Sequence, residues 1–372
     1  MINSKIIVGK DSISKLNYEG FYNECKSILV IYDILSEINS TKSKIKKAFG
    51  KDIKITYFKV KALERANTEI VDSCLKVLKD ISADLIICAG TQISHNVGKA
   101  VKYILTCNIN SFGDICDKKE DIKNLEQNND IKLIFITDAS GNHQQILTGY
   151  FEVLDNKSNT LYRFNKQCTI PYAVLVDEKV LDKLSNTAKV GIRIASLIMG
   201  LIVITNVTNQ QEKIAAMTAM DICFDENSNL SNLLTAEMYA GYDFLNLKDN
   251  VLNEFILSAI DETGEIYSLI LLLTMQKSIK NIVSSLSAED IKLLGLPFKI
   301  ENVQNDDDWR EKFAGIIENK LKIYFDDKDI PKKLNEIGLN SKQIEDIFEE
   351  LNSSLGYSEN LAKLKDICYI NY

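Results

Sequence analysis

The sequence predicts a protein of two parts, an α/β domain with a parallel sheet followed by an all-helical domain. Two observations predict this class. In the first half, short β-branched runs alternate with segments of helical spacing, which is typical of β-α-β units. After about Glu178 the strand signals end, and nearly every later segment has apolar residues at helical spacing. With 372 residues, 45% of them hydrophobic, the chain is long enough for two cores.

The first part is predicted as a Rossmann-like domain over residues 1–177. Its parallel strands are expected at residues 4–10, 27–33, 53–60, 84–90, 131–138 and 172–178. Segments with helical spacing between strands, such as 67–82, are expected to cover both faces of the sheet. Residues 151–155 and 160–164 break the alternation and predict a hairpin.

The second part is predicted as an all-helical domain over residues 178–372. Helices are expected first at 178–185, 188–205 and 210–224. The longest apolar run, 194–204, has eleven residues, which is too short to span a bilayer, so a buried core helix is expected there. Because no linker separates the two parts, a small-molecule ligand is expected in a cleft between them.

Charge and cysteine usage exclude several classes of partner. The net charge is -8, and both nucleic acid and anionic membrane require clustered Lys and Arg, so neither is expected as a partner. Eight scattered cysteines without close pairs are expected to be reduced thiols in a cytoplasmic protein.

Six segments carry motifs in a fixed order: INSKIIVGKDSISKL (2–16), SILVIYD (27–33), DLIICAGTQISHNVGKAV (84–101), KLIFITDASGNHQQILTGYFEVLD (132–155), YAVLVDEKVLDKLSNTAKVGIRIASLIMG (172–200) and DIPKKLNEIGLNSKQIEDI (329–347). In this order they resemble the iron-containing alcohol dehydrogenase superfamily, which includes glycerol dehydrogenases and dehydroquinate synthases. The resemblance covers the chain. It implies a dehydroquinate synthase-like fold and, as the family's activity, metal-dependent, NAD(P)-linked alcohol dehydrogenation, with a homodimer as a further expectation.

The resemblance also implies that the metal site is lost. The family holds its metal with one Asp and three His, or close variants, all from the helical domain. Here Arg193 falls at the Asp, and Leu197 falls at the His one helical turn later. No His occurs after His143. Since imidazole ligands are absent and an arginine repels cations, neither iron nor zinc is expected.

The nucleotide-binding segments are altered in the same comparison. The second and third glycines of the family's phosphate loop become Thr91 and Gln92, whose side chains intrude where a pyrophosphate needs bare backbone. A second family segment falls on 136–144, which includes Thr137, Asp138 and His143. The vestigial or altered cofactor positions are therefore Asp33, Gly90, Thr91, Lys99 and Thr137. NAD(P) is left as a weakened candidate cofactor.

The candidate catalytic residues are His143, Arg193 and Asp138. His143 is a candidate general acid or base because imidazole titrates near neutral pH. Arg193 either forms a salt bridge between helices or replaces the metal as a cation that binds an anion or polarises a carbonyl. Lys99 either acts at the cofactor or pairs with an acid on the surface, and His95 is interpreted as a structural histidine.

Two functions follow. The favoured one is a pseudoenzyme that keeps the dehydrogenase fold for a binding or assembly role. The alternative is a metal-independent enzyme, with NAD(P)-linked oxidoreduction as a candidate reaction, acting on a small anionic or carbonyl substrate in the cleft.

Overall fold

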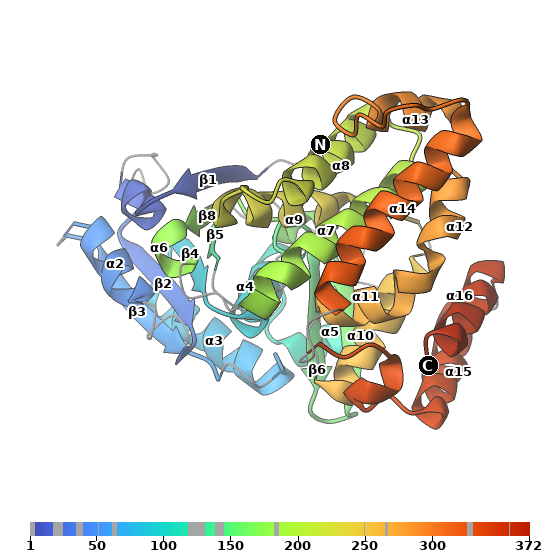
Figure 1. The fold of residues 1–372 in the computed structure, drawn as a ribbon. Coiled ribbons are helices and arrows are strands. Elements are labelled where there is room, and N and C mark those ends of the chain that lie inside the picture. Colours follow the sequence, from blue (N-terminus) through green and yellow to red (C-terminus); the bar gives the residue numbers. More distant parts are fainter. Residues whose placement is uncertain are drawn as a thin grey trace. The chain divides into compact units, whose positions relative to one another are not determined.

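The computed structural model describes residues 4–17, 25–34, 40–50, 52–61, 65–117, 131–137, 145–181, 186–248, 250–264, 267–325, 330–356 and 358–372. The chain forms two compact units, residues 1–184 and 185–372. The first carries all the described strands, and the second is helical (Figure 1). This is the predicted fold class.

The first unit alternates strands and helices as predicted. Its strands are β1 (Lys5–Gly9), β2 (Ser27–Tyr32), β3 (Lys54–Lys59), β4 (Leu85–Ala89), β5 (Lys132–Ile136), β6 (Tyr150–Asp155), β7 (Thr160–Asn165) and β8 (Ala173–Asp177). Its helices are η1 (Ser12–Asn17), α2 (Thr41–Ala48), α3 (Thr68–Ile81), α4 (Gln92–Cys107), α5 (Phe112–Asp117), η3 (Gln167–Thr169) and α6 (Glu178–Leu181).

Six strands form one parallel sheet in the order β1-β8-β5-β4-β2-β3. β6 and β7 pair separately as the predicted antiparallel hairpin. The strand order reverses at β2, because β3 lies on one side of it and β4 on the other. Ligands of parallel α/β sheets bind outside the carboxyl ends of the strands at such a reversal. Here those ends are Tyr32 and Ala89, which are partners in the sheet.

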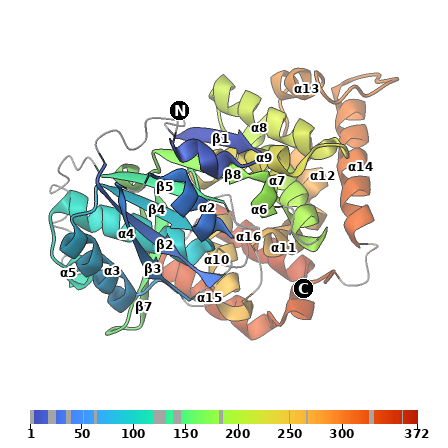
Figure 2. The same cartoon turned by 90° about the vertical axis from the view of Figure 1, so that its left-hand side faces the viewer.

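Helices cover both faces of this sheet, because side chains alternate between the two faces along each strand. On one face Val30 and Ile87 belong to a core that includes residues of η1 and α2. On the other face Cys88 lies directly beneath Gly98 of α4. Figure 2 shows α3 and α4 on one side of the sheet and α2 on the other. The predicted Rossmann-like arrangement is confirmed.

Helix α4 is buried along almost its whole length. It contacts β2, β4 and β5 of the sheet, and also α3, β6 and η3. As a result, its polar side chains His95, Lys99 and Lys102 are buried too. A buried cation requires acceptors, and the Lys102 Nζ donates to the carbonyl of Ile131 at 2.7 Å. The acceptors of Lys99 belong to the candidate site.

The described residues of the second unit form helices and no strand. The helices are α7 (Asn186–Asn206), α8 (Gln210–Phe224), α9 (Leu230–Leu245), α10 (Val251–Thr263), α11 (Tyr267–Met275), η4 (Gln276–Ser278), α12 (Ile279–Ser284), α13 (Ala288–Leu294), α14 (Asp306–Phe325), η5 (Leu334–Ile337), α15 (Ser341–Leu355) and α16 (Glu359–Ile370). Asparagine side chains accept hydrogen bonds at the N-termini of α8, α9, α10 and α15, which explains how these helices begin.

The apolar run 194–204 lies inside α7, which has 21 residues. Its window Lys189–Asn206, with a mean hydropathy of 1.6, could cross a membrane by length and composition. The prediction that this segment is too short to span a bilayer is therefore wrong. However, 67% of this window is buried inside the protein, and α7 packs against α8, α9 and α11. The prediction of a buried core helix is confirmed.

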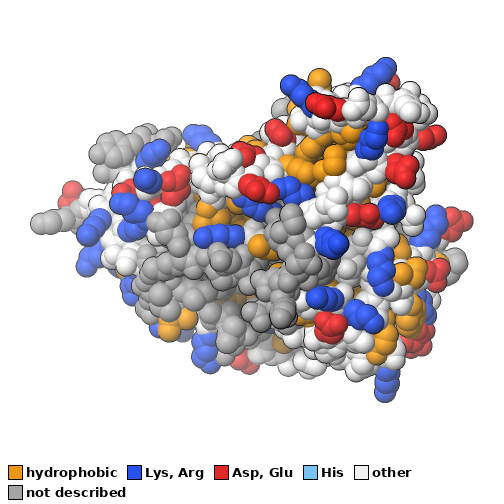
Figure 3. Space-filling view, viewed as in Figure 1, with side chains coloured by type: hydrophobic (Ala, Val, Ile, Leu, Met, Phe, Trp, Pro, Cys, Tyr) orange, Lys and Arg blue, Asp and Glu red, His pale blue; other side chains and the backbone are white. Residues whose placement is uncertain are grey.

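Charged side chains of both signs are interspersed on the face drawn in Figure 3. The described Lys and Arg side chains on that face do not form a continuous stripe. The exclusion of nucleic acid and membrane partners stays a prediction from the net charge of -8.

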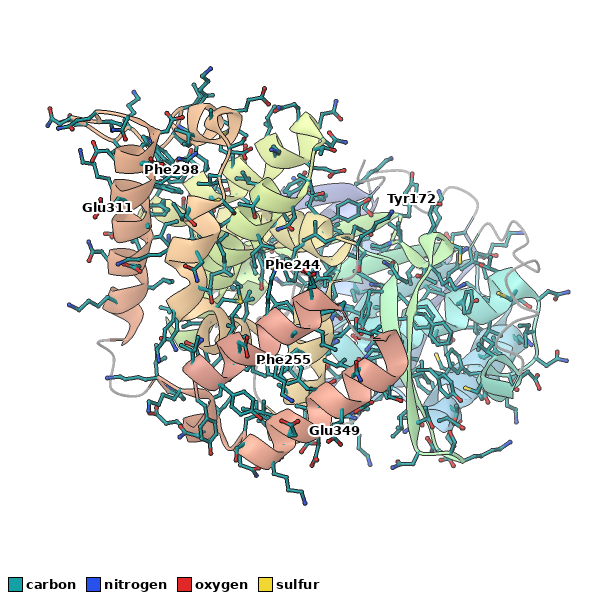
Figure 4. All side chains as sticks on the ribbon, turned by 90° about the vertical axis from the view of Figure 1, so that its right-hand side faces the viewer. Tyr172, Phe244, Phe255, Phe298, Glu311 and Glu349 are labelled. Atoms are coloured by element: carbon teal, nitrogen blue, oxygen red, sulfur yellow. The ribbon has the colours of Figure 1, made fainter. Side chains whose placement is uncertain are left out.

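Aromatic rings connect the helices of the second unit. Phe298 contacts Phe224 of α8 and Phe313 of α14, with ring centroids 4.8 and 5.3 Å apart (Figure 4). Phe255 of α10 stacks on Phe348 of α15 at 5.3 Å. Such pairs add about 0.5–1.5 kcal/mol each beyond the area they bury. They link helices that are distant in the sequence.

Candidate functional site

The candidate site lies at the carboxyl ends of β2 and β4, where Asp33 meets the loop that begins α4. The Asp33 side chain is completely buried. Its Oδ2 accepts a hydrogen bond from the backbone N–H of Thr91 at 2.5 Å. This contact follows from the sheet, because Tyr32 and Ala89 are partners and the next residues of both strands therefore meet. Two of the predicted cofactor positions, Asp33 and Thr91, thus contact each other directly.

Gly90 makes this contact sterically feasible. Its φ is +131°, in the region that favours glycine. A Cβ built on Gly90 would overlap the carboxylate of Asp33. The position of the Asp33 carboxylate thus requires a residue without a Cβ at Gly90.

The next two residues carry the side chains predicted to intrude into a phosphate loop. Thr91 is the N-cap residue of α4, but its hydroxyl makes no capping bond. Its Oγ1 is buried, and no described residue forms a hydrogen bond with it. Gln92 donates from Nε2 to Oε1 of Gln145 at 2.8 Å. The loop is therefore tied to residue 145 by side chains.

Lys99 lies on α4 and is 1% exposed. Its Nζ donates to the carbonyl oxygens of Gln145 and Tyr150, each at 2.9 Å, and lies 5.4 Å from the ring centroid of Phe135. The interpretation of Lys99 as a surface residue paired with an acid is wrong, because its side chain is buried and its ammonium group is bonded to backbone carbonyls. Burial lowers the pKa of Lys99 to about 7, and the nearby Cys88 acts weakly in the opposite direction.

We expect the Lys99→Met substitution to change stability in a pH-dependent way. The pKa of Lys99 is about 7 in the fold and 10.5 ordinarily. Between these values the unfolded chain binds a proton that the folded chain does not, so wild-type stability rises with pH. The destabilisation by the buried amine is therefore complete below about pH 7 and disappears above about pH 10.5. The free energy of unfolding of wild type, relative to Lys99→Met, should rise by about 1.4 kcal/mol per pH unit between pH 8 and 10.

Urea unfolding of both proteins at pH 6, 8, 9 and 10 measures this difference. Lys76→Met is the control, because Lys76 is exposed on α3. A difference for Lys99→Met that does not vary with pH would show that the buried amine keeps its ordinary pKa.

The other predicted residues of this unit are placed as follows. His95 is buried and stacks on Phe135, with ring centroids 4.5 Å apart. Its interpretation as a structural histidine stays a prediction. Thr137 donates from both N and Oγ1 to the carbonyl of Leu175, at 3.0 and 3.2 Å. Its cofactor role stays a prediction. Asp138 and His143 lie outside the described residues.

Arg193 lies on α7, in the helical unit. Its Nη1 donates to the carbonyls of Cys223 and Asp225, at 2.9 and 2.8 Å, and its Nη2 donates to those of Glu226 and Ser228, at 3.3 and 3.5 Å. These carbonyls belong to the C-terminal end of α8 and the loop after it, where a cation is favourable. The guanidinium thus fixes this turn through the backbone. A catalytic role for Arg193 stays a prediction.

The residues do not fit the metal that the resemblance implies. Leu197, at the position of a histidine ligand, is apolar and 2% exposed, and Arg193 is held by carbonyls. Both histidines of the chain, His95 and His143, precede the helical unit. In the described part of the chain, no three His, Cys, Asp or Glu side chains are grouped to hold a metal ion. An imidazole-rich iron or zinc site has no donors here.

The loop between β4 and α4 has lost one of the donors that a pyrophosphate would use. A pyrophosphate requires backbone N–H donors at the start of the helix. The N–H of Thr91 already donates to Asp33, and that carboxylate brings a negative charge to the same place.

Sequence reasoning missed Gln145 and Gly98. Gln145 links Gln92 to Lys99 and carries no motif, so nothing in the sequence could identify it. Gly98 could have been noticed, because a glycine inside an apolar helix often marks close packing.

No protein-family model and no curated protein matches the sequence. Solved structures match its fold. An iron-containing alcohol dehydrogenase from Thermococcus thioreducens is 15% identical, with a TM-score of 0.76 over 100% of this chain and 99% of that chain. The NADH-dependent butanol dehydrogenase A from Thermotoga maritima is 13% identical, with a TM-score of 0.76 over 100% and 97%. Sulfoacetaldehyde reductase from Bifidobacterium kashiwanohense, in complex with NAD+, is 12% identical, with a TM-score of 0.73 over 100% and 97%. The chain therefore has the fold of the iron-containing alcohol dehydrogenases.

Proposed function

We propose that this protein uses the iron-containing alcohol dehydrogenase fold for binding or assembly and does not catalyse metal-dependent alcohol dehydrogenation. Fold does not fix function, so the proposal depends on the site. The observation that carries it is the donor set of the helical unit. Arg193 and Leu197 stand at two positions that the resemblance assigns to metal ligands, and the chain has no histidine after His143.

The contacts of Arg193 support this proposal. An arginine that replaced the metal in binding a ligand would need N–H donors that the protein does not already use. Here the guanidinium has four carbonyl acceptors on the α8–α9 turn. These bonds account for an arginine at this position without a metal or a substrate.

The experiment is a combined metal and activity measurement. The protein is purified from medium supplemented with iron and zinc, and its bound metal is determined by mass spectrometry. Initial rates are then measured with NADH and NADPH on a panel of short aldehydes, and with NAD+ and NADP+ on the matching alcohols. We expect far less than one metal ion per chain and no turnover above the protein-free rate. One tightly bound metal per chain together with metal-dependent turnover would refute the proposal.

The second candidate is a metal-independent enzyme on a small anionic or carbonyl substrate, with NAD(P) as its candidate cofactor. It is favoured by two of the solved structures that share the fold, one named as NADH-dependent and one in complex with NAD+. In this reading Arg193, His143 and Asp138 act on the substrate. Turnover without metal that is lost in both Arg193→Ala and His143→Ala would support it.

The small-molecule ligand, the homodimer and the cytoplasmic location predicted from the sequence belong to this proposal as well. A thermal-shift screen with small molecules tests the first, since a ligand that binds only the folded state raises the melting temperature.

A further inference from the structure

Lys99 of α4 holds both ends of the segment 145–150, which leads into β6. Its side chain is 1% exposed, and its Nζ donates to the carbonyl oxygens of Gln145 and Tyr150, each at 2.9 Å. These acceptors are 46 and 51 positions away in the sequence. A single amine thus attaches the start of the β6–β7 hairpin to α4.

The segment 145–150 is a turn with its own internal bonds. The backbone N and the Oγ1 of Thr148 donate to the carbonyl of Gln145, at 3.2 and 2.9 Å, and the Oγ1 accepts from the N of Tyr150 at 3.1 Å. The carbonyl of Gly149 accepts from the N of Lys166, which follows β7, at 3.1 Å. These bonds keep the turn and the hairpin together, but they do not attach the turn to α4. The two bonds from Lys99 do.

The amine of Lys99 lies among uncharged groups. The ring of Phe135 on β5, 5.4 Å from the Nζ, is a weak partner for a cation. Buried carboxylates near α4 bond elsewhere, Asp155 at the far end of β6 to residues 157 and 158, and Asp33 to Thr91. The buried titratable side chains on α4 and on the elements packed against it are mainly thiols, phenols and one imidazole: Tyr32, Cys74, Cys88, His95, Lys102, Tyr103, Cys107, Cys116 and Tyr150.

Protonation of this amine is therefore unfavourable while the turn is in place. A neutral amine has two N–H groups, which match the two carbonyl acceptors. An ammonium adds a third N–H and a positive charge, and burying a charge without an ionic partner costs free energy. Burial accordingly lowers the pKa of Lys99 to about 7, and Cys88 acts in the opposite direction. When the turn leaves α4, the amine reaches water, so proton binding and release of the turn are coupled.

We propose that Lys99 is a proton-sensitive latch, which holds the turn 145–150 on α4 when its amine is neutral and favours release of the turn when its amine is protonated. The released part comprises the turn and the adjoining strand β6. This inference concerns the α/β unit alone, so it is tested independently of the proposed function.

Hydrogen exchange measured by mass spectrometry at pH 7.5 and 9.5 tests the proposal. Protection factors, which correct for the intrinsic effect of pH on exchange, are compared for residues 145–155 and for the central strand β2. Wild type is compared with Lys99→Met, which removes the amine, and with Lys99→Gln, which keeps uncharged N–H donors. Lys76→Met is the matched control, because Lys76 is exposed on α3.

We expect the protection of residues 145–155 in wild type to rise by up to about a hundredfold between these pH values. Both values lie between the pKa of Lys99 in the fold, about 7, and its ordinary pKa of 10.5, and in this range the opening equilibrium changes by up to about tenfold per pH unit. The protection of β2 should not follow this rise. In both Lys99 variants the protection of residues 145–155 should lose this pH dependence, whereas Lys76→Met should behave as wild type does.

Three results would overturn the proposal. One is constant protection of residues 145–155 in wild type. Another is a rise that persists in both Lys99 variants. The third is an equal rise in β2, which would mean that the whole α/β unit unfolds and that the turn is not released by itself. The comparison of 145–155 with β2 needs only wild type, so it decides the question even if neither Lys99 variant folds.

Discussion

Replacing Gly90 with alanine is expected to destabilise the protein by about 2–6 kcal/mol. Two effects add. Alanine at a φ of +131° is strained, at a cost of about 1–3 kcal/mol. The new Cβ would also overlap the Asp33 carboxylate, and forcing extra atoms into a packed site costs about 1–3 kcal/mol more. Asp33 cannot move away freely, because it is completely buried and bonded to Thr91.

Gly9→Ala separates the two effects. Gly9 has a similar φ of +139°, but a Cβ there would meet nothing within 4 Å. Urea unfolding of both variants should give a smaller loss for Gly9→Ala, with the difference measuring the contact with Asp33. Equal losses would show that the Asp33 carboxylate does not limit the space at Gly90.

The second large effect is expected at Gly98, where α4 packs on the sheet. A Cβ on Gly98 would overlap the Sγ of Cys88 on β4, and Leu133 is the next contact at 3.4 Å. In a helix, alanine is otherwise more favourable than glycine by about 1 kcal/mol. We expect Gly98→Ala nevertheless to destabilise the protein by about 1–3 kcal/mol, because the sulfur lies in a buried core.

A double-mutant cycle with Cys88→Ala tests the cause. Removing the sulfur should relieve the overlap, so the double variant should be more stable than the sum of the two single losses predicts, by about 0.5–3 kcal/mol. Gly315→Ala is the helical control, because a Cβ there meets nothing within 4 Å. It should be neutral or stabilising. Additive losses in the cycle would mean that Gly98→Ala acts elsewhere than at Cys88.

Much of the fold could be predicted because the relevant signals are local. The β-branched runs such as 84–90 and the helical spacing of 67–82 depend only on neighbouring residues, and β4 and α3 form there. Likewise, the apolar run 194–204 could be identified as a core helix, although only the structure gives α7 its length of 21 residues. The hairpin of β6 and β7 was also visible, since its strands are short and close in sequence.

The candidate site was predictable only as a set of positions. Asp33, Gly90 and Thr91 could be identified because they end strands or begin a helix. Their mutual contact could not be predicted, since it depends on β2 and β4 being neighbours although β3 lies between them in sequence. Arg193 shows the same limit. Its position on a helix could be read from the sequence, but its carbonyl partners lie 30 or more residues away.

The sequence by itself determined the class of fold, the presence of Thr91 and Gln92 after Gly90, and the absence of histidine after His143, because these are properties of residue type and local pattern. Only the tertiary structure decided what those residues contact. It buried Lys99 beneath the segment 145–150 and lowered its pKa, and it brought the Asp33 carboxylate to the N–H of Thr91. The physical reason is that desolvation and charge contacts are set by groups distant in the chain, which the order of strands in the sheet brings together.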